Sequence, residues 1–133
     1  MVSQSKVPLW KSALGNPLPR VAETPMGMLN AMFGKSRCRR YQRKELPWLA
    51  QFDTEIMANI AGSKEEDYVE VIRRLNDSPV VKAYELNISC PNVKHGGIGL
   101  GTDPKLAAHV TRICKEAAEK PVYVKLSPNV TNL

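Results

Sequence analysis

The sequence lacks any long hydrophobic run. No stretch approaches the roughly 18 consecutive apolar residues of a membrane-spanning helix, and no basic start followed by an apolar segment opens the chain. We therefore expect a cytoplasmic protein with no membrane partner. Cysteine is also scarce. The three cysteines, Cys38, Cys90 and Cys114, show neither metal-ligand spacing nor a disulfide framework. We expect no metal site and a reducing compartment.

Negative charge is in deficit, and the net charge of +6 comes from one short segment. Six cations lie within ten residues: Lys35, Arg37, Arg39, Arg40, Arg43 and Lys44. The rest of the chain is close to neutral, and no aromatic platform accompanies the basic segment. A charge confined to one segment does not indicate a nucleic-acid-binding fold, so no nucleic-acid partner is expected.

The remaining sequence alternates between strand and helix patterns. Residues 56–60 are typical of a buried strand, and Ser63 with Glu66 forms a predicted capping box that opens a helix. The apolar stripe predicted for this helix consists of Tyr68, Val71, Ile72 and Leu75. A shorter helical piece is predicted over 45–52, with Leu46, Leu49 and Phe52 on one side.

A second long helix is predicted after Asp103, which caps it, and Pro104, which occupies its first turn. Its predicted buried stripe is Leu106, Val110, Ile113, Cys114 and Ala117. Residues 122–126 then form the next strand. The order strand, helix, strand, helix, strand predicts parallel βαβ units and an α/β fold, but it does not choose between an open sheet and a barrel.

The densest chemistry follows the strand that begins near Ala83. Tyr84, Leu86 and Ile88 share one face of this strand, and Pro91 ends it. Two amides, a hydroxyl and a thiol gather at its end: Asn87, Ser89, Cys90 and Asn92. Polar groups at the C-terminal end of a buried strand are where α/β barrels hold their active sites. An ordinary turn with an inert thiol is the alternative interpretation.

Four stretches resemble one family in the same order: GNPLPRVAETPMGMLNA (15–31), IMANIAGS (56–63), NISCPNVKHGG (87–97) and VYVKLSPNVTNL (122–133). The family is the class 1 dihydroorotate dehydrogenases, and NVKHGG favours the NAD-linked (class 1B) branch. The resemblance implies a TIM (β/α)₈ barrel, which needs about 250 residues. We therefore expect an incomplete barrel, about its first half, with the N-terminal strand missing.

The resemblance also implies the chemistry. The complete enzyme is an FMN-dependent oxidoreductase that converts dihydroorotate to orotate in de novo pyrimidine (UMP) biosynthesis. Cys90 matches the family's catalytic base. The positions that match substrate contacts are Asn30, Ala31, Asn87 and Asn92, and those that match FMN contacts are Asn59, Asn87 and Lys125. A cation at Lys125 would stabilise the anionic reduced flavin.

The implied partners are those of the NAD-linked branch. Electrons pass from FMN to a second subunit that carries FAD and an iron–sulfur cluster, and then to NAD, while the catalytic subunit forms a homodimer. The glycine-rich loops that hold the flavin phosphate lie in the part of the family barrel beyond residue 133. We therefore expect this chain alone to be inactive and to bind FMN weakly. A dihydropyrimidine dehydrogenase-like flavoenzyme is an alternative.

Two segments of the single domain 1–133 depart from the family: residues 1–14 and 33–44. Where the family has G-L-x-N-P-G, this chain has the basic segment, and reading it one base later permits L-E-N-P-G-V-D-V-I. Reading 2–12 two bases later permits a strand followed by K-S-T-T-L-E-K-R. Our hypothesis is a frame-damaged coding sequence. The alternatives from another class are a non-catalytic pseudogene product and a basic peptide that binds nucleic acid.

Overall fold

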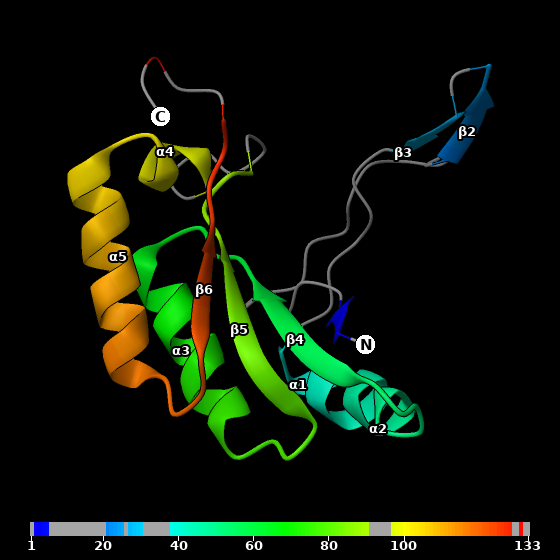
Figure 1. Cartoon of the computed structure of the whole chain (residues 1–133). Coiled ribbons are helices and arrows are strands. Elements are labelled where there is room, and N and C mark those ends of the chain that lie inside the picture. Colours follow the sequence, from blue (N-terminus) through cyan, green and yellow to red (C-terminus); the bar gives the residue numbers. More distant parts are fainter. Residues whose placement is uncertain are drawn as a thin grey trace.

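A parallel sheet forms the centre of the computed structural model, which describes residues 2–5, 21–25, 27–30, 38–90, 97–128 and 131. The four strands lie in the order β1 (Val2–Ser5), β4 (Glu55–Ile60), β5 (Val81–Asn87) and β6 (Val122–Lys125) (Figure 1). Each neighbouring pair is parallel. Strand β1 was not predicted, because residues 1–14 show no clear periodicity.

A separate hairpin joins β2 (Val21–Thr24) to β3 (Gly27–Asn30). The two strands are antiparallel, and Thr24 lies opposite Gly27 across the turn. Proline and glycine near this position are typical of turns. The sequence of residues 24–27 indicates a turn, which the hairpin confirms, but the strands on either side of it were not predicted.

The long helices α3 (Glu65–Asn76) and α5 (Pro104–Ala117) cover one face of the sheet (Figure 1). Their apolar stripes form a core with Tyr84, Leu86 and Ile88, all fully buried. A doubly wound open sheet carries helices on both faces, whereas a barrel carries them on the outside only. Consecutive strands β4, β5 and β6 with helices on one face form a barrel wall. The fold is therefore α/β, an incomplete TIM barrel.

Helix α3 begins one residue later than predicted. The N-cap is Lys64, not Ser63. The carboxylate that serves this end belongs to Asp67, not Glu66, and it accepts hydrogen bonds from the backbone N–H groups of Ser63 (2.9 Å) and Lys64 (3.2 Å). A lysine side chain has no acceptor, so the reciprocal half of a capping box does not form. The predicted apolar stripe of α3 is confirmed.

Helix α5 starts as predicted. The Asp103 carboxylate accepts from the backbone N–H groups of Lys105 and Leu106, and Pro104 occupies the first turn. Val110 and Cys114 are buried, but Leu106 is 40% exposed, so its predicted burial is wrong. Periodicity identifies the side of a helix that a residue occupies. It does not reveal whether a neighbouring element reaches that turn.

A third helix precedes β4. It consists of three consecutive parts: α1 (Cys38–Arg40), the π-helical η1 (Tyr41–Glu45) and α2 (Leu46–Leu49). Proline lacks an N–H, and its ring displaces the carbonyl of the preceding turn. Ahead of Pro47 the helix widens, and the Leu46 N–H donates to the Tyr41 oxygen, five residues back. The helix ends at Leu49, before the predicted end at residue 52, and Phe52, predicted to share one side with Leu46 and Leu49, is 50% exposed.

The anomalous segment 33–44 is described only from residue 38. Cys38 and Tyr41 are buried in the common core, and the basic side chains of this stretch are exposed. The helix also contacts α3, because the Gln42 amide donates to the Arg74 carbonyl oxygen (2.6 Å). Among the described residues, no helix is long and apolar enough to cross a membrane.

Candidate functional site

Four polar side chains form a row across three neighbouring strands. Asn59 on β4 is the register partner of Glu85 on β5, and Asn87 on β5 is the partner of Lys125 on β6. Alternate residues of a strand face opposite sides of the sheet, and Tyr84 and Leu86 face the helices. These four residues, called the polar row below, therefore occupy the face that the described helices do not cover. They lie at the C-terminal ends of parallel strands, where barrel enzymes place their active sites.

Hydrogen bonds connect the polar row from end to end. Glu85 Oε1 accepts from Lys125 Nζ (3.0 Å) and also from Asn59 Nδ2. Asn59 Oδ1 in turn accepts from Asn87 Nδ2 (3.4 Å). Asn59 is 3% exposed and the Glu85 side chain 13%, whereas the Lys125 side chain is 41% exposed. The row therefore runs from a buried amide and carboxylate to an ammonium group that reaches solvent.

The end of β5 is held from the helix side as well. The Tyr68 hydroxyl of α3 donates to the backbone oxygen of Asn87 (3.0 Å). Burial raises the pKa of Tyr68, so this hydroxyl stays protonated and remains a donor. Ser89 donates through its hydroxyl (3.1 Å) to Asn87 Oδ1. Both the backbone and the side chain of Asn87 are thus fixed in place.

Cys90 follows this strand end and is half-buried. Its backbone oxygen accepts from the Ile98 N–H (3.0 Å), which joins the two sides of the 91–96 segment. Gly97 lies in this closure with φ +55°, and a Cβ there would come within 2.3 Å of the Cys90 oxygen. Only glycine fits both the left-handed conformation and the close approach. The hydrogen bond from Ile98 therefore holds the backbone of Cys90 at the C-terminal edge of the sheet.

The other two thiols have a different environment. Burial raises the pKa of Cys38 to about 11 and that of Cys114 to about 12. Both thiols are therefore protonated at neutral pH and lie in the hydrophobic core. This confirms the expectation that Cys114 is a buried core residue. Cys90 is the described cysteine that lies outside the core.

A sequence model of the family "Dihydroorotate dehydrogenase" matches residues 9–133. The chain belongs to the dihydroorotate dehydrogenase family. Its relatives include proteins named dihydroorotate dehydrogenase B (NAD(+)), catalytic subunit. The Geobacillus protein is 60% identical over 120 residues, and the Anoxybacillus flavithermus protein is 59% identical over 124 residues. These alignments cover 90% and 92% of this chain, but only 38% and 40% of the relatives. The chain thus spans about two-fifths of the relatives' length.

Most of the residues that this dihydroorotate dehydrogenase family member brings together were predicted from the sequence. Asn59, Asn87 and Lys125 lie in one hydrogen-bonded row, and Cys90 lies three residues beyond Asn87. Asn30 ends β3, but its side chain is not among those described. Ala31, Asn92, Lys94 and His95 also lie outside the described residues. The roles assigned from the resemblance remain predictions.

Glu85 was not predicted from the sequence although it connects the polar row. The sequence nevertheless contains a pattern that indicates its role. Glu85 precedes Asn87 by two positions and so shares its face of the strand, and its charge is opposite to that of Lys125. A carboxylate between the buried residues Tyr84 and Leu86 requires a partner on the opposite face.

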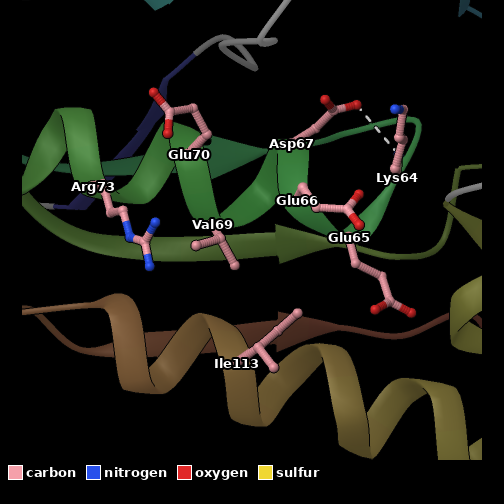
Figure 2. A pocket seen from close by; sticks show the side chains of 8 residues that line it. All are labelled: Lys64, Glu65, Glu66, Asp67, Val69, Glu70, Arg73 and Ile113. Atoms are coloured by element: carbon pink, nitrogen blue, oxygen red, sulfur yellow. Dashed lines mark hydrogen bonds between the residues drawn. The ribbon is translucent and has the colours of Figure 1, made fainter.

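A groove on the helix-covered side of the sheet lies apart from the polar row. It occupies about 670 Å³ between α3 and α5 and is lined by Lys64, Glu65, Glu66, Asp67, Val69, Glu70, Arg73 and Ile113 (Figure 2). None of the predicted site residues that the structure describes lines it. Within the described part of the chain, no group of three or more His, Cys, Asp and Glu residues could hold a metal ion.

Proposed function

We propose that this chain is part of the catalytic subunit of an NAD-linked dihydroorotate dehydrogenase, an enzyme that oxidises dihydroorotate to orotate for pyrimidine biosynthesis. The observation that carries the proposal is the polar row beside Cys90 at the C-terminal edge of a barrel wall. The family match and the names of the relatives support the same function. These names favour dihydroorotate as the substrate over the alternative, a dihydropyrimidine dehydrogenase-like activity.

The polar row suits FMN as a cofactor. The flavin has a flat ring edged by carbonyl oxygens and ring nitrogens, and the row carries an ammonium group and two amides on one side of the sheet. Asn59, Asn87 and Lys125 would hold this edge. When bound, FMN would supply the acceptor for the hydride that leaves dihydroorotate. The Lys125 cation would offset the negative charge that then develops.

The proton of the reaction would go to Cys90. Its thiolate would take the proton from the ring carbon next to the one that loses hydride, so that a C–H bond breaks and an S–H bond forms. A cysteine can act in this way only as the thiolate. The substrate is a flat ring with amides and a carboxylate. Side-chain amides at Asn30, Asn87 and Asn92, with Ala31 beside them, would bind it.

The partners follow from the same proposal. In the complete enzyme the electrons would leave through a second subunit with FAD and an iron–sulfur cluster and reach NAD. The words "catalytic subunit" and "(NAD(+))" in the relatives' names support a separate subunit for electron transfer to NAD. The catalytic subunits would form a homodimer in the cytoplasm. For the 133-residue chain alone, we expect neither dihydroorotate oxidation nor tight FMN binding.

A chimeric enzyme tests the proposal. Residues 55–128 would replace the matching segment of the Geobacillus relative, and orotate formation would be measured with an artificial electron acceptor. We expect dihydroorotate oxidation that falls by about 100-fold or more in Cys90→Ala. The control is Cys114→Ala, which removes a core thiol and should keep the activity of the folded chimera. Equal activity with and without Cys90, or a preference for dihydrouracil, would overturn the proposal.

We also infer that residues 1–14 and 33–44 derive from a shifted reading frame. The support is that each segment departs from the family and that each, when shifted, permits the family's wording at the matching place. The basic segment would then imply no nucleic-acid partner.

A further inference from the structure

We propose that Glu85 is a positioning residue that orients Lys125 and sets the donor–acceptor direction of the whole polar row. The hydrogen bonds that support this role all join described residues. Its meaning for a ligand rests on the proposed function. The resemblance assigned roles to Asn59, Asn87 and Lys125, but it assigned none to Glu85.

One carboxylate oxygen of Glu85 has two donors. Glu85 Oε1 accepts from Lys125 Nζ and from Asn59 Nδ2. An ionised carboxylate only accepts hydrogen bonds, so the side of the Asn59 amide that faces it must be the nitrogen. Asn59 is 3% exposed, and a buried polar atom without a partner is costly. The orientation of the Asn59 amide is therefore fixed by Glu85.

The Asn59 amide carries this direction along the row. Because the Asn59 nitrogen faces Glu85, the Asn59 oxygen faces Asn87 and accepts from its Nδ2 (3.4 Å). The Asn87 oxygen then faces away from Asn59 and accepts from the Ser89 hydroxyl (3.1 Å). In both amides the nitrogen points toward the Glu85 end of the row. A single acceptor thus sets the direction of three successive hydrogen bonds.

The polar row offers mainly donors to a ligand. Asn59 is buried, so the donors within reach of a ligand are the second hydrogen of the half-buried Asn87 amide and the two Lys125 hydrogens that are not given to Glu85. The amide oxygens are directed along the row by their own donors. At this end of the row, Asn87 and Lys125 therefore present N–H donors, and they fit a ligand edge rich in acceptors, such as carbonyl oxygens or an anionic ring nitrogen. This deepens the proposed function by naming the ligand edge that the row selects.

Glu85→Gln tests the inference, because glutamine keeps the size of the side chain but removes the charge and adds a donor. The 133-residue chain would be acetylated in competition, and the labelling of each lysine would be read by mass spectrometry. We expect Lys125 labelling to rise about twofold to fivefold relative to Lys105, the change that loss of a half-exposed ion pair produces. Glu116→Gln, which removes an exposed carboxylate that pairs with Arg112, is the matched control and should leave Lys125 labelling unchanged.

A second readout follows the amides themselves. In ¹⁵N NMR spectra, hydrogen exchange of the Asn59 and Asn87 side-chain amides should accelerate in Glu85→Gln while backbone signals outside β4–β6 stay in place. If that variant fails to fold, Lys125→Met decides. It keeps the acceptor, so the Asn59 amide should remain protected. Unchanged Lys125 labelling in folded Glu85→Gln, or loss of Asn59 protection in Lys125→Met, would overturn the inference.

The two proposals fail separately. An inactive chimera together with the expected labelling and exchange changes would remove the proposed function and leave the role of Glu85 intact. An active chimera with unchanged labelling would do the reverse.

Discussion

Asn87 and Lys125 are direct register partners, and each is the last residue of its strand. Parallel pairing therefore brings an amide and an ammonium group to one edge of the sheet. Glu85 joins Lys125 to Asn59 on β4, and Asn59 Oδ1 accepts a hydrogen bond from Asn87. Cys90 follows three residues after Asn87. An amide and a cation thus lie at the C-terminal edge of the described sheet, and the half-buried Cys90 follows Asn87 along the chain.

Lys125 should contribute strongly to flavin binding in the chimeric enzyme. Lys125→Met keeps most of the apolar stem but removes the cation. A hydrogen bond from a charged group typically contributes about 1.5–3 kcal/mol, so we expect FMN affinity to fall by about 10- to 100-fold. Fluorescence titration of the apoprotein with FMN measures this. Lys105→Met removes an exposed lysine of α5 and should leave the affinity unchanged. Equal affinity in both variants would exclude Lys125 from the cofactor site.

The three thiols should react at very different rates. At about pH 7.5, iodoacetamide should label Cys90 first, because burial keeps Cys38 and Cys114 protonated and covered. Peptide mass spectrometry over a time course measures each site. In urea all three should label at similar rates. Labelling of Cys114 before Cys90 in the folded chain would contradict the described core.

Stability should fall at alkaline pH. The ordinary thiol pKa is 9.0, and burial raises the pKa of Cys38 to about 11 and that of Cys114 to about 12. Both thiols are protonated in the folded and unfolded chains below pH 9, so this contribution to stability is complete there. Above pH 9 the unfolded thiols ionise first, and the contribution is lost as the pH rises through the folded pKa values. The slope reaches about 1.4 kcal/mol per pH unit for each thiol.

Urea unfolding at pH 8, 9 and 10 checks this slope. Cys114→Ala removes one of the two titrating thiols and should flatten the curve between pH 9 and 10, whatever it does to the stability at pH 8. Identical slopes in the two proteins would mean that Cys114 does not ionise on unfolding in this range.

Gly97 should be intolerant of a side chain. In Gly97→Ala the new Cβ would meet the Cys90 oxygen at 2.3 Å, and the residue would keep a positive φ of 55°. A backbone with φ +55° and ψ −124° is one that L-residues rarely adopt, and holding a residue there costs about 1–3 kcal/mol. We expect the free energy of unfolding to fall by at least this amount. Gly99→Ala is the matched control, since a Cβ added there would have no atom within 4 Å and alanine favours helix. It should leave stability unchanged or raise it slightly.

The reading-frame hypothesis is checked on the coding DNA. We expect the codons for residues 33–44, read one base later, to spell L-E-N-P-G-V-D-V-I, and those for 2–12, read two bases later, to spell K-S-T-T-L-E-K-R after a strand. Codons that cannot encode these residues in the shifted frames would refute the hypothesis. A chain with both frames restored should then lose its basic cluster.

Much of the helical and strand content could be predicted because it depends on local chemistry. Asp103 and Pro104 start α5 in any context that allows a helix, and the stripe from Tyr68 to Leu75 makes α3 amphipathic. Predictions that depended on distant contacts were less successful. Leu106 and Phe52 have the right spacing for burial, but no described element covers them, and both are at least 40% exposed.

By itself, the sequence determined the α/β alternation, the family and the grouping of Asn87 with Cys90, because these depend on residue order and spacing along one strand. The tertiary structure decided that the helices α3 and α5 cover one face, which favours a barrel wall over an open sheet. It also decided that Glu85 binds both Asn59 and Lys125. Register between strands far apart in the sequence sets such contacts, and a carboxylate's partners follow from that register rather than from its neighbours in the chain.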